Sequence, residues 1–115
     1  MVQTINSAYA LQKIFKDWNR DYYTIEGYET ILQFYDSIDE NMRLDVIGIC
    51  GEWTEYTAED LYNDYENYCY SYDEEEQLQM VANEEYKELV KDILLQLERE
   101  TIVYILSDTY LVMRF

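Results

Sequence analysis

The sequence contains no proline, no histidine and only three glycines among its 115 residues. Without histidine, the chain lacks the commonest general base, the usual partner of Ser and Cys nucleophiles, and a frequent zinc ligand. Clusters of proline and glycine mark linkers between domains, and none occurs here. We therefore predict a single domain over residues 1–115 that is not an enzyme.

Cysteine and long apolar runs are also scarce. Two cysteines, Cys50 and Cys69, are too few for a disulfide framework, which indicates a reducing compartment. Apolar runs such as Ile93-Leu94-Leu95 are far shorter than the roughly 20 residues that cross a membrane. The first residues show neither the basic nor the apolar region of a signal peptide. These features predict a cytoplasmic protein.

Positive charge is missing from the middle of the chain, since no Lys or Arg lies between Arg43 and Lys87. That stretch holds 13 of the 25 carboxylates, and the formal net charge of the chain is −17. Solubility of a small domain needs a net charge of only roughly 2–8. Adaptation to high salt would spread the acids over the whole chain. The charge instead predicts a basic protein partner, with no direct contact to nucleic acid or membrane.

Seven tyrosines are interleaved with these acids, which suggests mimicry of nucleic acid. Residues at i and i+4 on a helix lie about 6 Å apart along the axis, and each DNA strand carries a phosphate every ~3.4 Å. Rows of carboxylates can therefore face Arg and Lys side chains that normally bind phosphates, and tyrosine rings can lie where bases stack. The predicted partner-binding residues are Glu52, Glu55, Tyr56, Glu59, Asp60, Tyr62, Asp64, Glu66, Tyr70, Asp73, Glu74, Glu75 and Glu76.

Hydrophobic periodicity predicts an α+β fold in which three to four helices pack with a three-stranded antiparallel sheet. The strands are expected at about 44–50, 101–106 and 110–115, with the last two forming a hairpin. Ser7, Thr57 and Asn83 are the expected N-caps of helices, and a further helix is expected at about 28–38.

The tyrosines of the acidic stretch fall into two groups by their position relative to the apolar face of the helix after Thr57. Tyr65, Tyr68 and Tyr72 share a helical face with Leu61, which favours a place in the core. The other group, Tyr56, Tyr62 and Tyr70, falls outside that face and is expected at the interface. The run 73–76 is expected to end this helix or to form the loop that follows it.

Other kinds of site have less support. Clustered carboxylates suit calcium, but the sequence has no D-x-D-x-D-G loop. Glu52 and Glu55 have the composition of an acid–base pair, but a chain this small leaves little room for a substrate cleft. Apolar or acidic surroundings raise a thiol pKa, so Cys50 and Cys69 are expected to be poor nucleophiles. We predict no cofactor, no metal and no catalytic residue.

The segment LDVIGICGEWTEY at residues 44–56 resembles small acidic proteins encoded by phages and mobile elements of Gram-positive bacteria. Those proteins pair a motif of the type L-D-V-I-x-I-C-x-x-[aromatic]-x-E-[aromatic] with a T-x-V strand and a final strand that ends in Phe. TIVY at 101–104 and YLVMRF at 110–115 are similar. The resemblance covers roughly the C-terminal two thirds and implies an inhibitor of host defence in a bacterial cell, with anti-CRISPR proteins as the leading class. It carries over no functional residue.

Taken with the charge, this resemblance predicts an anti-CRISPR protein that binds a guide-loaded Cas nuclease and blocks its DNA-binding cleft. One alternative is an antirestriction DNA mimic, which a rod-like dimer would favour. Another is an immunity or antitoxin-like partner of a basic protein, which a basic protein encoded nearby would favour. A third is an enzyme that uses carboxylates, which a deep pocket holding two acids with raised pKa would favour.

Overall fold

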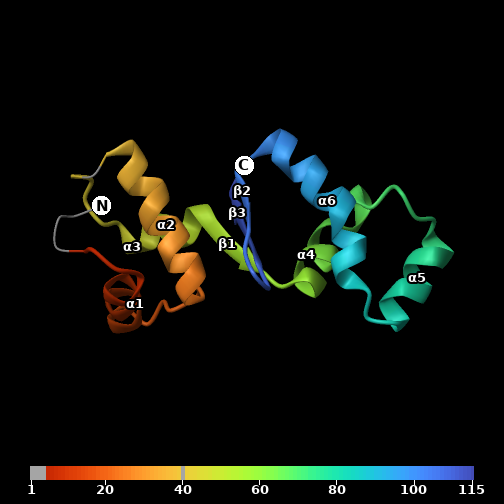
Figure 1. Cartoon of the computed structure of the whole chain (residues 1–115), viewed down its shortest axis with the longest axis horizontal. Helices are drawn as coiled ribbons and strands as arrows, with labels where there is room; N and C mark the ends of the chain where they lie inside the picture. The colour runs from red at the N-terminus through yellow and green to blue at the C-terminus, as the bar shows by residue number, and fades with distance from the viewer. Residues whose placement is uncertain (1–4, 40) are drawn as a thin grey trace. The chain divides into compact units, whose positions relative to one another are not determined.

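The computed structural model describes residues 5–39 and 41–115, and within them it contains six α-helices and a three-stranded antiparallel sheet (Figure 1). The predicted α+β class is confirmed. The chain divides into two compact units, one that ends at Glu55 and one that comprises Tyr56–Phe115. A single domain over residues 1–115 stays a prediction. No helix in the described residues is long and apolar enough to cross a membrane.

The first unit is built mainly from helices. Its elements are α1 (Ala8–Asp17), α2 (Ile25–Ile38) and α3 (Val46–Glu52), and β1 (Trp53–Tyr56) begins directly after α3. Ser7 caps α1 as predicted, because its hydroxyl accepts a hydrogen bond from the Ala10 N–H at 3.1 Å. The rings of Phe15, Tyr23 and Tyr28 meet edge to face, with centroids 5.2 to 6.1 Å apart. This aromatic cluster lies where α1 packs against α2.

The strand predicted at about 44–50 is wrong, since most of this segment forms α3. An apolar run this short fits either a strand or a helix. Asp45 decides the outcome, because its side chain accepts a hydrogen bond from the Gly48 N–H at 2.9 Å and caps the helix. Val46 and Ile49, three residues apart, are buried, whereas Ile47 is 57% exposed. Burial therefore follows the period of a helix, and the strand begins only at Trp53.

The second unit contains four helical segments and a hairpin. They are α4 (Ala58–Tyr65), the 3-10 helix η1 (Glu66–Tyr68), α5 (Glu74–Ala82), α6 (Tyr86–Glu100), β2 (Val103–Ile105) and β3 (Tyr110–Met113). Helix α6 carries an apolar stripe, which is buried at Leu89, Val90, Ile93, Leu94 and Leu97. It packs against Leu61 and Tyr62 of α4 to form the core of this unit. Figure 1 shows α4 beside α6, and α5 also contacts α6.

The predicted C-terminal hairpin is confirmed, with shorter strands than expected. β2 pairs antiparallel with β3, with Val103 opposite Val112 and Ile105 opposite Tyr110. The Leu106 N–H donates to the Thr109 carbonyl at 2.9 Å and closes the turn. Leu111 and Val112 are buried.

The expected three to four helices are too few for two reasons. Residues 46–52 form a helix in place of a strand, and the acidic stretch forms two α-helices, α4 and α5, where one was predicted. Thr57 caps α4 as predicted, through a hydrogen bond from the Asp60 N–H to its hydroxyl at 3.2 Å. The predicted cap Asn83 instead ends α5, and Glu85 precedes α6.

Candidate protein-interaction surface

Glu52 and Glu55 hold the first unit together. The Tyr35 hydroxyl donates a hydrogen bond to the Glu52 carboxylate. The Glu55 carboxylate accepts from the Thr24 N–H at 3.0 Å and from the Thr24 hydroxyl at 2.7 Å, at the N-terminus of α2. A carboxylate there also interacts favourably with the helix dipole. Both predicted contact residues therefore have a structural role, whatever else they bind.

The remaining predicted acids belong to the second unit, and all of them are exposed. Those on α4 and η1 are Glu59, Asp60, Asp64 and Glu66. Glu59 and Asp60 lie in the first turn of α4, where negative charge stabilises the helix. The helix dipole stabilises both carboxylates without a cationic side chain beside them. Their charge therefore remains available to a cation of a partner.

Asp73 to Glu76 begin α5, so the prediction that they end the preceding helix or form a loop is wrong. Asp73 is the N-cap and accepts a hydrogen bond from the Glu76 N–H at 2.8 Å. The Glu76 carboxylate accepts in return from the Asp73 N–H at 3.4 Å, which completes a capping box. Glu74 and Glu75 fill the first turn between them, so four adjacent acids are compatible with one helix terminus.

We call these exposed acids of the second unit the acidic surface. It comprises Glu59, Asp60, Asp64, Glu66, Asp73, Glu74, Glu75 and Glu76. Within the described residues, the ion pairs Lys87–Asp108 and Lys91–Glu88 involve none of them. The acidic surface therefore keeps its negative charge available for an external cation.

The interface tyrosines were only partly predicted. Tyr70 is 64% exposed, as expected for a contact residue. Tyr62 is only 8% exposed and belongs to the core, which is contrary to the prediction. Tyr56 is half-buried, and burial together with a hydrogen bond to Tyr65 raises its pKa well above the usual value. Its ring contacts that of Tyr65 edge to face at 6.1 Å.

The tyrosines expected in the core do pack against it. Tyr65, Tyr68 and Tyr72 are half-buried beside the core of the second unit. The rings of Tyr65 and Tyr68 stack with centroids 5.7 Å apart. The Tyr68 hydroxyl donates to Glu100 at 3.1 Å. Their rings are therefore engaged inside the unit, which leaves Tyr70 as the exposed aromatic of the acidic stretch.

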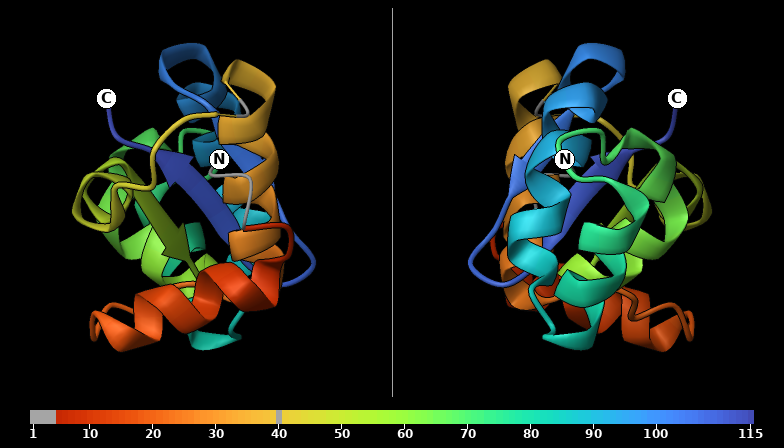
Figure 2. Two further views of the ribbon diagram at one scale, coloured as in Figure 1. Left: turned by 90° about the vertical axis from the view of Figure 1, so that its left-hand side faces the viewer. Right: turned by 90° about the vertical axis from the view of Figure 1, so that its right-hand side faces the viewer.

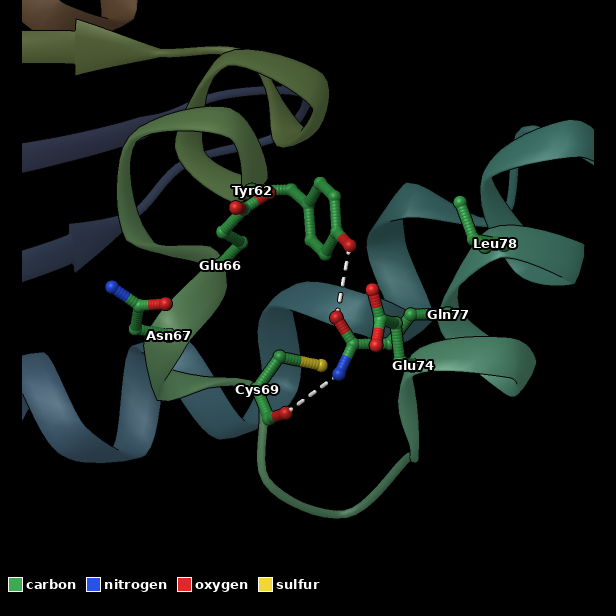
Figure 3. Close-up of a pocket in the computed structure, with 7 residues that line it drawn as sticks. All are labelled: Tyr62, Glu66, Asn67, Cys69, Glu74, Gln77 and Leu78. Carbon is green, nitrogen blue, oxygen red and sulfur yellow. Dashed lines mark hydrogen bonds between the residues drawn. The ribbon is translucent and has the colours of Figure 1, made fainter.

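A cleft of about 380 Å³ opens beside the acidic surface (Figure 3). Gln77 of α5 crosses it, accepting from the Tyr62 hydroxyl at 2.9 Å and donating to the Cys69 carbonyl at 2.9 Å. Glu66 and Glu74 contribute carboxylates from different helices to its lining, which is completed by Asn67 and Leu78. The cleft is open and polar, so it extends the acidic surface rather than enclosing a substrate.

Sequence reasoning missed a buried carboxylate that orders this region. Asp92 of α6 is 8% exposed and accepts hydrogen bonds from the Ser71 N–H at 2.9 Å and the Ser71 hydroxyl at 2.8 Å. These bonds tie the segment before α5 to α6. An indication was present in the sequence, because Asp92 lies three residues after Leu89 on the apolar side of its helix.

Neither cysteine has the surroundings of a reactive thiol. Burial raises the pKa of the Cys50 thiol, and burial together with the Asp92 carboxylate raises that of Cys69. Both therefore remain protonated thiols at neutral pH. Among residues 5–39 and 41–115, no three His, Cys, Asp or Glu side chains are grouped so as to hold a metal ion.

Comparisons with protein-family models, with curated proteins and with solved structures found no match to this chain.

Proposed function

We propose that the chain is an inhibitor that binds the basic nucleic-acid-binding surface of another protein through its acidic surface. The observation that carries this proposal is the set of eight exposed carboxylates on α4, on η1 and in the first turn and N-cap of α5, without a Lys or Arg in those elements. Residues 56–115 hold 15 acids and four basic residues, a formal charge of −11. The carboxylates repel one another, and counterions or a cationic partner reduce this repulsion.

The partner we favour is a CRISPR effector nuclease with its guide RNA bound. Such a nuclease reads a short motif in duplex DNA through Arg side chains and holds nucleic acid in a positively charged channel. Carboxylates on α4 and α5 would replace DNA phosphates in such a channel, and each replacement releases the same counterions as DNA does. The resemblance of residues 44–56 to small acidic phage proteins supports the same class.

Competition with DNA tests this proposal. Guide-loaded Cas nuclease and labelled target DNA are titrated with the protein, and the complexes are separated on a native gel. We expect the DNA complex to disappear as a protein–nuclease complex forms. Intact DNA binding together with unimpaired cleavage, across nucleases of several types, would contradict the proposal.

Neutralising three acids of α4 locates the contact. The variant Glu59→Gln, Asp60→Asn, Asp64→Asn keeps the side-chain shapes but removes three charges, and we expect it to inhibit at least tenfold less. A matched variant, Asp17→Asn, Glu29→Gln, Glu98→Gln, removes three charges at other exposed positions. It should inhibit like the wild type, because only charges at the contact are held close to the partner's cations. Equal loss in both variants would mean that net charge alone matters.

A further inference from the structure

Helix α1 has the opposite charge balance to the other described α-helices. It carries Lys13 and Lys16 against one acid, Asp17, and Arg20 follows shortly after its end. The helices α2, α3, α4 and α5 themselves contain no Lys or Arg. In α6 the acids outnumber the basic residues by four to three. Among the described α-helices, α1 is therefore the one with a positive balance.

The cations of α1 lie on its solvent-facing side. Tyr9, Lys13 and Lys16 follow one another at spacings of four and three, so they share a helical face, and all three are exposed. The opposite face buries Leu11 and Phe15, where α1 packs against α2 (Figure 2). The basic face is thus available to a partner without any change in the fold.

Three large aromatic side chains are exposed along the same segment. Tyr9 is 70%, Trp18 55% and Tyr22 60% exposed. In the described part of the chain, no ion pair involves Lys13, Lys16 or Arg20. The nearby Asp21 accepts a hydrogen bond from the Tyr28 hydroxyl, which orients its carboxylate toward the first unit's own core but leaves its charge in place. Lys13 and Lys16 are exposed, and Arg20 is half-buried. Cations and exposed rings that alternate along one short segment are typical of sites where single-stranded nucleic acid binds.

We propose that α1 and the loop after it bind single-stranded nucleic acid, contrary to the prediction made from the net charge of the chain alone. The residues of this α1 surface are Tyr9, Lys13, Lys16, Trp18, Arg20 and Tyr22. The cations contact phosphates and the rings stack on bases, whose π-faces make such stacking independent of sequence. The proposal does not depend on the acidic surface, which belongs to the other unit. If the target is a ribonucleoprotein, α1 would contact the exposed part of its RNA.

The charge of the whole chain weakens this binding but does not prevent it. At physiological ionic strength the screening length is about 8 Å. Carboxylates farther than this from the contact therefore repel the nucleic acid only weakly. Three phosphate contacts on a single strand give a slope of about −2 for log K against log salt, at roughly −0.7 per contact. We therefore expect weak binding that is measurable at low salt.

A labelled 12-nucleotide oligouridylate tests the proposal by fluorescence anisotropy with the full chain in 50 mM NaCl. The double variant Lys13→Glu, Lys16→Glu should bind at least tenfold more weakly. The matched variant Lys87→Glu, Lys91→Glu makes the same change in net charge on α6 and should change binding less than twofold. Circular dichroism of both variants establishes that they are folded. Equal weakening in both, or no binding by the wild type, overturns the proposal.

Aromatic stacking has its own readout. The oligonucleotide should quench Trp18 fluorescence, while Trp53, which is only 2% exposed, stays shielded. Trp18→Ala should weaken binding about fivefold or more, whereas Tyr70→Ala, which removes an exposed ring from the acidic stretch, should leave it unchanged. The triple variant of α4 should not weaken oligonucleotide binding, which separates this proposal from the proposed function.

Two other results would replace the proposal. Binding to phosphatidylglycerol vesicles without binding to the oligonucleotide would make α1 a membrane contact. Self-association that is lost on raising the salt and in the Lys13→Glu, Lys16→Glu variant, again without oligonucleotide binding, would make its partner the acidic surface of a second copy.

Discussion

Gly27 and Gly51 both lie within helices, but the space beside them differs. A Cβ atom at Gly27 would collide with the Glu55 carboxylate, whereas one at Gly51 would meet nothing within 4 Å. In an open helical site, alanine stabilises a protein by about 0.5–1 kcal/mol relative to glycine. At Gly27 that gain competes with the loss of two hydrogen bonds from Thr24 to Glu55, each worth about 1–2 kcal/mol. The two glycines therefore form a natural matched pair.

We expect Gly51→Ala to raise the free energy of unfolding by about 0.5–1 kcal/mol and Gly27→Ala to lower it by about 1 kcal/mol. Urea denaturation measures both. In a Glu55→Ala background the collision with the carboxylate is gone and only the close contact with the Tyr23 Cβ atom at 3.3 Å remains, so Gly27→Ala should lose most of its destabilising effect. If Gly27→Ala has the same effect with and without Glu55, the carboxylate does not occupy the site.

At the scale of the element, α5 is attached by few contacts. None of its residues is fully buried. The Gln77 amide makes three hydrogen bonds, including one to the Tyr72 carbonyl at 2.8 Å, and so joins α5 to residues 62–72. Met80 and Val81 add partly buried apolar surface. An element with so little buried area is expected to open locally before the unit unfolds.

Gln77→Ala should therefore loosen α5 selectively. The lost hydrogen bonds, at about 1 kcal/mol each, should speed amide hydrogen exchange in α5 by at least tenfold while α6 stays protected. Gln79→Ala, an exposed change on the same helix, should leave exchange unchanged. Equal acceleration in α5 and α6 would mean that the amide supports the whole unit.

Helix α5 illustrates the difference between features that the sequence predicts and features that depend on tertiary packing. The caps Ser7 and Thr57 and the C-terminal hairpin follow from local chemistry, and the structure confirms them. Tyr62 was predicted at the interface because it falls outside the helical face that Leu61 shares with the core tyrosines, and no helix was expected at 74–82 that could cover it. Once α5 forms, Gln77 reaches the Tyr62 hydroxyl and the ring is buried. Tertiary packing of this kind is not encoded in periodicity.

At the scale of the whole molecule, a formal charge of −17 gives stability and binding opposite responses to salt. Self-repulsion among carboxylates destabilises the folded chain, and added salt screens it. The proposed binding is an attraction between this charge and a basic groove, which the same salt weakens. If added salt makes the protein more stable while it inhibits less, the loss of inhibition comes from weaker attraction to the partner and not from unfolding.

We therefore expect the urea midpoint to rise between 20 mM and 500 mM NaCl while the concentration for half-inhibition increases at least tenfold. Removing three charges from the acidic surface by Glu59→Gln, Asp60→Asn and Asp64→Asn should flatten both dependences, because it reduces the repulsion and the attraction together. The matched variant Asp17→Asn, Glu29→Gln, Glu98→Gln should flatten only the dependence of stability. Inhibition that does not respond to salt would contradict an electrostatic contact, and would direct attention to apolar groups such as Tyr70.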